Sequence, residues 1–523
     1  MYFKLLYPWL LVLLFQVTFA QKPGKQHDPL KNITILYTND LHANLEPHIV
    51  SWISETRPVG GFANIVTFVK KEKQANPNAL YFDAGDFFTG PNICSLTKGE
   101  AIIDLLNYLP IDATCIGNHE FDYGWQNMLT QFQKAKFPIL NGNIFPENSN
   151  ELLWNKPYLI LQQNGLKIGV IGLHGKYAFY DTVAEIVRRG IEAKDEKVYL
   201  QKYIDLLKNK VDLIVLLIHE GIPGRQSSKG SSDVERNLQC DLNLAKDIKG
   251  IDILITGHAH QGTPKALNSN GTIIVSTDAL GIEVGKLEIQ YNQKQKRIVN
   301  YSNELNYLFD DEIEDDIQTS KAIDRWKTNL AEITNQKVSS IAEPLTRSYG
   351  DESLLGNMVA DAMLSIFPDY DIAVVNSGGL REDVTGPNVS IGNLISAFPF
   401  PNTIVQCEIK GSVLKQLLEQ SVGKTHGILQ VSKGTTIEYN NTLPTGNQIV
   451  HCLIKGNPLN EDSVYKILTN NFLAEGGDSF TSFKNVDHKI DTNIEIVQSM
   501  IQYMKTFDLY KPKLEGRVVN IGK

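Results

Sequence analysis

Cysteine is scarce in this chain, which contains only five among its 523 residues. A fold held together mainly by disulfides needs many more, so a disulfide scaffold is excluded, and the odd number leaves at least one cysteine unpaired within the chain. Cys407 and Cys452 lie in two similar runs that both read as strands. A disulfide between them and two separate buried thiols are equally compatible with this pattern. Cys115 lies inside an apolar run, where we expect a core thiol.

An excess of basic residues is also absent, because the net charge is -9. Binding to a nucleic-acid backbone depends on a lysine- and arginine-rich surface that releases counterions, so this charge argues against nucleic acid as the main partner. A small anionic substrate stays compatible with an acidic surface, since metal ions can dominate the field of one cleft. The sequence leaves the oligomeric state open.

No later run approaches the roughly 20 apolar residues that span a bilayer. Near the N-terminus, Lys4 precedes an apolar run at residues 5–19, and Ala20 completes a small-residue cleavage pattern. This arrangement predicts a signal peptide over residues 1–20, with an uncleaved membrane anchor as the alternative. The polar C-terminus lacks the hydrophobic tail of a glycolipid-anchor signal. We therefore expect a secreted protein, extracellular or lumenal, without a stable membrane anchor.

Low-complexity tracts and short repeats are absent, and 42% hydrophobic with 21% charged residues is the composition of a folded protein. The length predicts two domains in addition to the leader. N-x-Ser/Thr sequons fit a secretory route and predict a glycoprotein, although the triplet is common by chance. The five sequons begin at Asn32, Asn270, Asn300, Asn388 and Asn440.

Short apolar runs alternate with amphipathic stretches between residue 33 and about residue 307. The apolar runs are typical of buried strands, and the amphipathic stretches are typical of helices between them. This rhythm indicates an α/β layered domain. The predicted strands cover residues 33–37, 80–83, 113–116, 167–173, 213–218 and 251–256, and two of the predicted helices cover residues 65–74 and 199–208.

An acidic stretch at residues 310–316 precedes a polar helical pattern that ends near residue 336. This pattern predicts either a linker helix or a solvated surface helix of the first domain. A second α/β segment follows, with apolar runs at residues 372–375, 403–409 and 465–468. We therefore divide the chain into a signal peptide (1–20), a first domain (28–310), a linker helix (311–336) and a second domain (337–523).

Side chains of the types that bind metal ions directly follow five of the predicted strands. The carboxyl ends of strands are where ligands bind in open α/β sheets, so we expect these side chains to meet. Two divalent ions about 3.5–4 Å apart clamp the attacking and leaving oxygens of an in-line displacement, and they need a shared carboxylate and separate imidazoles. Asp86 is the predicted bridge. We assign Asp40, His42 and His260 to one ion, and Asn118, His219 and His258 to the other.

His119 neighbours this cluster without being needed as a ligand. It would stabilise the phosphoryl charge or protonate the leaving alkoxide, and Asp122 would hold its imidazole in the useful tautomer. Each short motif alone is compatible with a turn or a helix cap. We interpret His174, which follows a comparable strand, as a structural histidine. The combination of five ligand clusters at strand ends is what predicts a metal site.

These motifs resemble the calcineurin-like metallophosphoesterases, whose signature runs Asp-x-His, Gly-Asp, Gly-Asn-His-Asp/Glu, His, Gly-His-x-His. Residues 37–46 and 117–124 look like the 5'-nucleotidase branch in particular, and the resemblance extends over essentially all of the mature chain. It implies a four-layer α/β/β/α metallophosphoesterase domain joined by a helix to a C-terminal α/β nucleotide-binding domain that can rotate. In this branch the last ligand position is often Asn or Gln, whereas this chain has His260.

The implied activity is hydrolysis of nucleotides to nucleoside and phosphate by a water activated between two divalent ions. Zinc is the expected metal, with manganese or another divalent ion as the alternative. A UDP-sugar hydrolase, an apyrase and a cyclic-nucleotide phosphodiesterase would use the same metal site. A nucleotide-binding protein without turnover is the alternative from another class.

The resemblance also implies how the second domain would bind substrate, with two aromatic rings that stack on the base. Asp351 occupies a position where ecto-5'-nucleotidases carry a phosphate-facing Arg. We therefore predict weak binding of di- and triphosphates, unless Arg347 compensates from a rearranged loop. By resemblance, Phe400 and Phe472 stack on the base, Asn402 assists, Asp478 binds the ribose hydroxyls, and Asn376 and Arg381 contact the ribose or phosphates.

Overall fold

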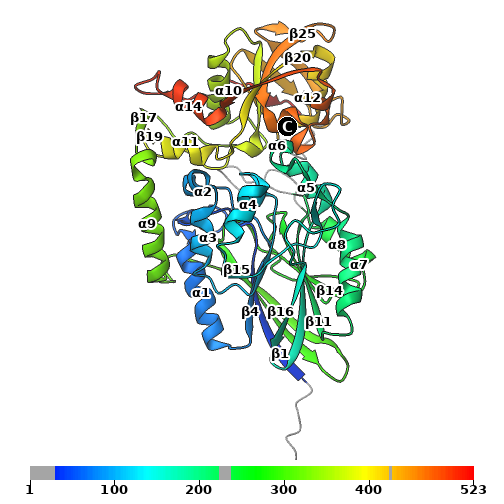
Figure 1. Cartoon of the computed structure of the whole chain (residues 1–523). Helices are drawn as coiled ribbons and strands as arrows, with labels where there is room; N and C mark the ends of the chain where they lie inside the picture. The colour runs from blue at the N-terminus through cyan, green and yellow to red at the C-terminus, as the bar shows by residue number, and fades with distance from the viewer. Residues whose placement is uncertain (1–29, 223–236, 423–426, 523) are drawn as a thin grey trace, which may run out of the picture.

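The computed structural model describes residues 30–222, 237–422 and 427–522, and the predicted signal peptide lies outside these ranges. Figure 1 shows two domains, one above the other, with helix α9 (Ile317–Thr334) running along one side of the N-terminal domain. Within the described ranges, no helix is both long and apolar enough to cross a bilayer.

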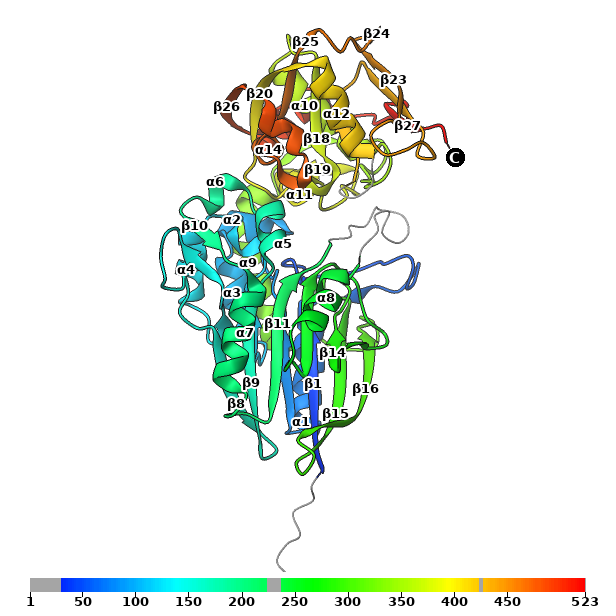
Figure 2. The same ribbon diagram turned by 90° about the vertical axis from the view of Figure 1, so that its right-hand side faces the viewer.

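Two six-stranded sheets form the centre of the N-terminal domain. Their inner faces pack together through alternate apolar side chains, such as Ile33 and Ile35 on one sheet and Val215 and Leu217 on the other. Helices α1 (Phe62–Ala75) and α3 (Glu100–Leu106) cover the outer face of the first sheet. Helices α7 (Glu196–Leu207) and α8 (Gln239–Asp247) cover the second sheet, as Figure 2 shows. The predicted four-layer α/β/β/α order is therefore confirmed.

Every strand predicted in this domain forms, but the strands are divided between the two sheets. In the first sheet, β1 pairs in parallel with β4 and antiparallel with β15. The first sheet has the order β16 (Arg297–Tyr307), β15 (Glu283–Asn292), β1 (Leu30–Thr38), β4 (Ala79–Asp83), β5 (Ala113–Cys115) and β6 (Ile139–Leu140). The second has the order β13 (Leu267–Ser269), β14 (Thr272–Val275), β12 (Ile253–His258), β11 (Leu213–Glu220), β9 (Leu166–His174) and β8 (Tyr158–Gln163).

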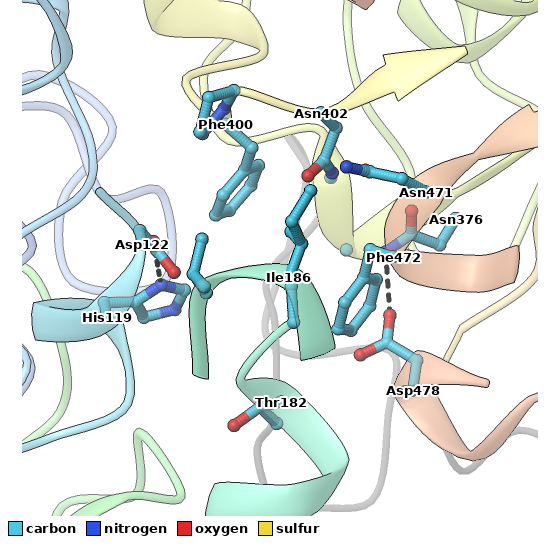
Figure 3. A pocket seen from close by; sticks show the side chains of 15 residues that line it. His119, Asp122, Thr182, Ile186, Asn376, Phe400, Asn402, Asn471, Phe472 and Asp478 are labelled. Carbon is cyan, nitrogen blue, oxygen red and sulfur yellow. Dashed lines mark hydrogen bonds and ion pairs between the residues drawn. The ribbon is translucent and has the colours of Figure 1, made fainter. Parts of the chain in front are cut away.

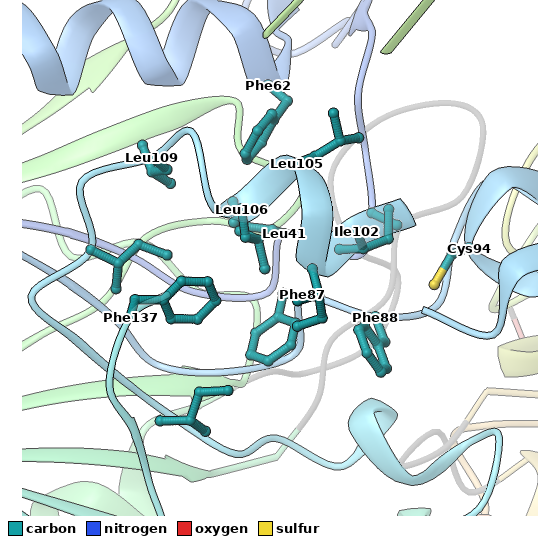
Figure 4. Close-up of a cluster of buried hydrophobic side chains, with 14 of the residues drawn as sticks. Leu41, Phe62, Phe87, Phe88, Cys94, Ile102, Leu105, Leu106, Leu109 and Phe137 are labelled. Atoms are coloured by element: carbon teal, nitrogen blue, oxygen red, sulfur yellow. The ribbon is translucent and has the colours of Figure 1, made fainter. Parts of the chain in front are cut away.

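An apolar core beneath α1 and α3 anchors one of the ligand-bearing loops (Figure 4). Phe87 and Phe88 follow β4 and are buried in this core, with their ring centroids 5.3 Å apart in a T-shaped contact. Edge-to-face aromatic pairs prefer this geometry. Because Asp86 directly precedes the two rings, burial of the rings fixes the position of its carboxylate.

The C-terminal domain is built around a five-stranded sheet that carries helices on both faces. Helices α10 (Leu354–Ile366), α11 (Ile391–Ala397) and α14 (Ile496–Met504) pack on one face, and α12 (Gly411–Val422) packs on the other. The sheet has the order β21 (Leu429–Val431), β18 (Ile372–Asn376), β25 (Val464–Asn470), β20 (Thr403–Lys410) and β26 (His488–Glu495). A second sheet has the order β24 (Asn457–Pro458), β23 (Ile449–Ile454), β22 (Thr435–Tyr439) and β27 (Val518–Asn520).

The five cysteines are all free thiols. Cys407 lies on β20 and Cys452 on β23, in two different sheets, and both are buried in one apolar core. Of the two alternatives that the sequence left open, the structure therefore has the separate core thiols. Cys115 is buried between the two sheets of the N-terminal domain, as expected.

Helix α9 begins after Asp316, whose carboxylate accepts a hydrogen bond from the Thr319 backbone N–H at 3.0 Å. Such an N-cap satisfies a donor that the helix itself leaves unpaired. Trp326 of α9 packs against the core of the N-terminal domain, and its indole N–H donates to Asp104 at 2.9 Å. The helix connects the N-terminal domain to the C-terminal domain and also lies on the surface of the N-terminal domain. It is therefore both a linker helix and a surface helix, the two alternatives that the sequence left open.

Candidate metal centre and substrate cleft

The predicted ligands from both sheets converge at the carboxyl ends of their strands. His42 follows β1 and His260 follows β12, and their Nε2 atoms lie 3.0 Å apart. The Asp40 carboxylate lies 3.3 Å from the His260 Nε2 atom and 3.8 Å from the His42 Nε2 atom. These three side chains form a compact donor group.

A second donor group lies beside the first. The Asp86 carboxylate lies 3.1 Å from the Nε2 atom of His219, and the Asn118 side-chain oxygen lies 3.1 Å from the same nitrogen. His258 completes this group, and its ring centroid lies 5.1 Å from that of His219. Asp86 also forms a donor group with His42 and His119, so it connects the two halves of the cluster. The structure thus brings together all seven residues that the sequence predicted as metal ligands.

The backbone is strained at five of these seven positions, where φ is positive in residues other than glycine. Each such residue costs on the order of 1–3 kcal/mol, and such strain concentrates at functional sites. Backbone hydrogen bonds across the site hold it, including the His42 N–H to the Asp86 carbonyl at 2.9 Å. The strained residues and their φ values are Asp40 (53°), His42 (47°), Asp86 (61°), His258 (76°) and His260 (52°).

Buried side chains behind the cluster fix the ligand loops. The Glu120 carboxylate accepts hydrogen bonds from the backbone N–H groups of Gly117 at 2.6 Å and Asp86 at 3.0 Å. It also accepts from the two residues after Asp86, at 2.9 and 3.0 Å. A Cβ atom at Gly117 would lie 2.2 Å from the Asp86 carboxylate, so only glycine fits there. Asn39 donates to the Asp40 carboxylate at 2.7 Å and thereby orients a second ligand.

The electrostatics of the cluster suit a cation. Burial lowers the pKa of His42 and His258 well below the usual value, so these imidazoles are neutral and have a free lone pair. Burial also lowers the pKa of His219, but the negative charge of Asp86 outweighs burial and raises that pKa to about 10. Although burial raises the pKa of Asp86, the surrounding histidines lower it well below its ordinary value.

The donor set fits divalent metal ions. Carboxylate oxygens, an amide oxygen and four imidazoles surround one spot, and each donor group of three has its ligand atoms within 4.8 Å of one another. Zinc and manganese accept mixed nitrogen and oxygen ligands of this kind. The chain therefore carries a metal-binding site at the carboxyl ends of its strands.

His119 lies at the edge of the cluster and faces the cleft. Its Nδ1 atom lies 2.7 Å from the Asp122 carboxylate, which also accepts a hydrogen bond from the Thr89 hydroxyl at 2.6 Å. Its Nε2 atom lies 3.9 Å from Asp86. The Asp122 contact leaves Nε2 as the ring nitrogen that points toward the cluster and a substrate.

One cleft between the domains joins His119 and Asp122 to the predicted substrate residues (Figure 3). The amide of Asn376 donates to the Asp478 carboxylate at 2.8 Å and accepts a hydrogen bond from Asn470 at 2.9 Å. This network fixes the orientation of Asp478 toward the cleft. The predicted substrate residues that line the cleft are Asn376, Phe400, Asn402, Phe472 and Asp478.

Three charged residues singled out in the sequence are not in the lining of the cleft, but Arg381 lies beside it. Arg381 is not among the residues that line the cleft, but its guanidinium carbon lies 5.9 Å from the Phe400 ring centroid, and its charge adds to the effect of burial in lowering the pKa of His42. Asp351 is exposed and also does not line the cleft. Arg347 donates to the Arg381 carbonyl.

Sequence reasoning missed two parts of this cleft. The side-chain oxygen of Asn471 is buried and has no hydrogen-bond partner among the described residues, and the residue lines the cleft. Its position directly before Phe472 was the only available signal. Ile186 and Val187 of the N-terminal domain also line the cleft. Two apolar residues in a short surface helix carry no sequence signal for binding.

A four-layer α/β/β/α domain with imidazole and carboxylate ligands at its strand ends is a metallophosphoesterase, and residues 33–262 match the calcineurin-like phosphoesterase family. Residues 331–485 match the C-terminal domain of 5'-nucleotidases. The chain is 30% identical to snake venom 5'-nucleotidase from Naja atra, over 93% of this chain and 98% of that protein. It therefore belongs to the 5'-nucleotidase family, and it is a phosphoric monoester hydrolase.

Two further relatives agree. The chain is 27% identical to the 5'-nucleotidase of Homo sapiens, over 93% of this chain and 90% of that protein. The crystal structure of the 5'-nucleotidase precursor from Thermus thermophilus superimposes with a TM-score of 0.82 at 26% identity, covering 94% of this chain and all of that one.

Proposed function

We propose that the chain hydrolyses nucleoside 5'-monophosphates to nucleoside and phosphate. The observation that supports this most directly is the single cleft that His119, Phe400 and Phe472 line together, with the rings of His119 and Phe400 only 5.8 Å apart. A phosphate at the metal cluster and a base beside the two aromatic rings would then belong to one molecule. The family relatives named as 5'-nucleotidases support the same substrate class.

Two divalent ions would be held by the two donor groups, with Asp86 shared between them. When bound, such ions lower the pKa of an attacking water and neutralise charge on the phosphoryl oxygens. We propose zinc, because His42, His219, His258 and His260 make the donor set rich in imidazole, and imidazole suits zinc.

The protein's own groups would position the phosphate and manage one proton. His119 would donate a hydrogen bond from Nε2 to a phosphoryl oxygen or to the leaving ribose oxygen, where negative charge develops. Asp122 would accept a hydrogen bond from the Nδ1–H group, keep the ring in place and stabilise the doubly protonated imidazole that this donation requires. Asp478 would accept hydrogen bonds from the ribose hydroxyls, and Asn471 would contact the edge of the base with its unpaired oxygen.

We also propose that the chain enters the secretory pathway, on the basis of the predicted signal peptide; a relative named for venom is consistent with this route. For the mature chain we keep the proposed boundaries of 28–310, 311–336 and 337–523.

The test is phosphate release from AMP, ADP, ATP, UDP-glucose and a cyclic nucleotide by the chain expressed from Gln21. Each reaction is run with zinc, with manganese and with a chelator. We expect chelator-sensitive release that is fastest from AMP. Faster release from another ester would replace the substrate assignment, and binding of metal and nucleotide without turnover would contradict the proposed activity.

A further inference from the structure

Two short helices of the N-terminal domain extend to the substrate cleft. We call residues 176–188, which contain α5 (Lys176–Thr182) and α6 (Glu185–Arg188), the α5–α6 arm. Thr182, Ala184, Ile186 and Val187 of this arm line the cleft together with residues of the C-terminal domain. The arm is therefore the part of the N-terminal domain that faces the predicted base site.

Ile186 lies in the part of the cleft that contains the two predicted base-stacking rings. Figure 3 shows its side chain between Phe400 and Phe472, and all three residues line the same cleft. Ile186 is 54% exposed, so it is not held in place by burial in a core. An apolar side chain between two aromatic rings occupies the kind of surface on which a base stacks.

The arm is also bonded to the loop that carries Asp478. The Ser479 hydroxyl donates to the Asp181 carboxylate at 2.5 Å and lies 3.3 Å from the Tyr177 hydroxyl. Asp478 and Ser479 both have positive φ values, of 48° and 58°. Residues in this region are strained and need neighbouring contacts to keep their conformation. The contact between Asp181 and Ser479 thus links the position of the arm to the predicted ribose-binding loop.

Little room remains in the cleft in this arrangement. The space open to the centres of water molecules is about 50 Å³. One water needs on the order of 10–15 Å³ by this measure, so the cleft has room for roughly four waters. A nucleotide is larger than this space, and the Ile186 side chain takes up part of the cleft near the two rings.

We propose that Ile186 competes with the nucleobase for the space between Phe400 and Phe472, and that the Asp181–Ser479 contact holds this occluded arrangement. The inference rests on the proposed nucleotidase function. Ile186 is then a specificity-determining residue that opposes substrates with a base and leaves base-free phosphate esters unaffected. Its side chain lowers the fraction of molecules that are ready to bind a base, and apparent affinity falls in proportion to that fraction.

The test compares Ile186→Ala with the parent protein on AMP and on ribose 5-phosphate, which lacks the base. We expect the KM for AMP to fall roughly fivefold with kcat unchanged, because a larger fraction of molecules can accept the base. The kinetic constants for ribose 5-phosphate stay the same. Asp181→Ala, which removes the contact with Ser479, lowers the KM for AMP in the same direction. Ile160→Ala is the matched control, since Ile160 is a 42% exposed isoleucine on β8, outside the cleft.

A rise in the KM for AMP would overturn the inference, because Ile186 would then support the base instead of displacing it. An equal change for both substrates would overturn it too, since the effect would not depend on the base. If the parent protein releases phosphate from neither ester, the proposed function fails on its own. Calorimetric titration with adenosine then decides the inference separately: tighter binding by Ile186→Ala supports it, and unchanged or weaker binding overturns it.

Discussion

At the scale of single residues, hydrogen bonds to Asp122 and from Thr89 to Asp122 hold the imidazole of His119 in place. Asp122 lies 2.7 Å from its Nδ1 atom and accepts a second bond from Thr89 at 2.6 Å. A carboxylate in this position fixes the tautomer of the ring. The remaining nitrogen, Nε2, is directed at the metal cluster and can act on a substrate oxygen.

His119→Ala should lower kcat for AMP by about 10²–10⁴-fold, the usual contribution of a positioned acid or hydrogen-bond donor. Metal content, measured by elemental analysis, should not change, because His119 is not one of the predicted ligands. His451→Ala, at an exposed histidine on β23, is the matched control and should keep full activity. Loss of metal from His119→Ala would instead make this residue a ligand.

Asp252 gives a prediction about pH and stability. Burial raises the pKa of its carboxyl from 3.8 to about 6, although the carboxylate accepts a hydrogen bond from the Ile214 N–H at 2.8 Å. A folded-state pKa above the unfolded value means that the folded protein binds the proton more tightly. The stabilisation that Asp252 contributes through this pKa difference is therefore present in full below pH 3.8. It is lost as the pH rises through about 6.

Asp252→Asn keeps an acceptor for Ile214 and removes the titration. The free energy of unfolding of the variant should rise relative to the parent between about pH 4 and pH 6, by at most about 1.4 kcal/mol per pH unit. Urea denaturation at several pH values measures this difference. Parallel pH curves for the two proteins would contradict the predicted shift.

The structure brings the seven predicted ligands together because each one lies at or just after the carboxyl end of an apolar strand, where binding residues collect. Asn118 and His219, far apart in the chain, indeed lie 3.1 Å apart. Ile186 could not be predicted in this way. Its role depends on which surface of the other domain it faces, and that information is not contained in the local sequence.

At the scale of elements, the last strand of the chain is held by a buried ion pair. Arg517, directly before β27, donates two hydrogen bonds of 2.8 Å to the Asp361 carboxylate on α10 and one of 2.9 Å to the Val431 carbonyl. Both charged side chains are buried, with 5% and 6% exposed. The pair connects the C-terminal strand to the helix at the centre of the domain.

Arg517→Met should lower the free energy of unfolding by about 3–5 kcal/mol, because it leaves the Asp361 charge buried without its partner. Adding Asp361→Asn to this variant should recover much of the loss, since the amide still accepts from the Lys433 N–H, which lies 2.7 Å from Asp361, and carries no charge. Denaturant unfolding of the single and double variants measures both effects. Equal stability of the two variants would show that the loss comes from side-chain packing instead.

Element positions were predicted more accurately than their pairing. The apolar run at residues 213–218 is strand β11, as expected, but nothing in it shows that β11 pairs with β9 and β12 instead of β4. Strands buried on both faces lack the alternation that would define a partner. The hairpin of β15 and β16 was not predicted, because most of β16 is exposed and polar.

At the scale of the whole molecule, the two domains have separate apolar cores. Between the two domains, the Asn92 backbone N–H donates to the Ser396 hydroxyl at 3.0 Å, and Ser95 donates to the Pro399 carbonyl at 3.2 Å. A domain with its own apolar core can in principle fold alone, and domains of one chain usually move relative to each other. All seven predicted metal ligands belong to the N-terminal domain, whereas both predicted base-stacking rings belong to the C-terminal domain.

Calorimetry should therefore show two unfolding transitions, and added zinc should raise only the temperature of the N-terminal one. A ligand at about 100 times its Kd stabilises the folded domain that binds it by about 2.7 kcal/mol. Adenosine without metal should raise only the C-terminal transition, because its base would bind to Phe400 and Phe472. His258→Ala should abolish the zinc effect and keep the adenosine effect, which separates loss of a ligand from general damage. If zinc raised the temperatures of both transitions together, the interface would couple the unfolding of the two domains. The cleft would then open only when the whole molecule unfolds in part.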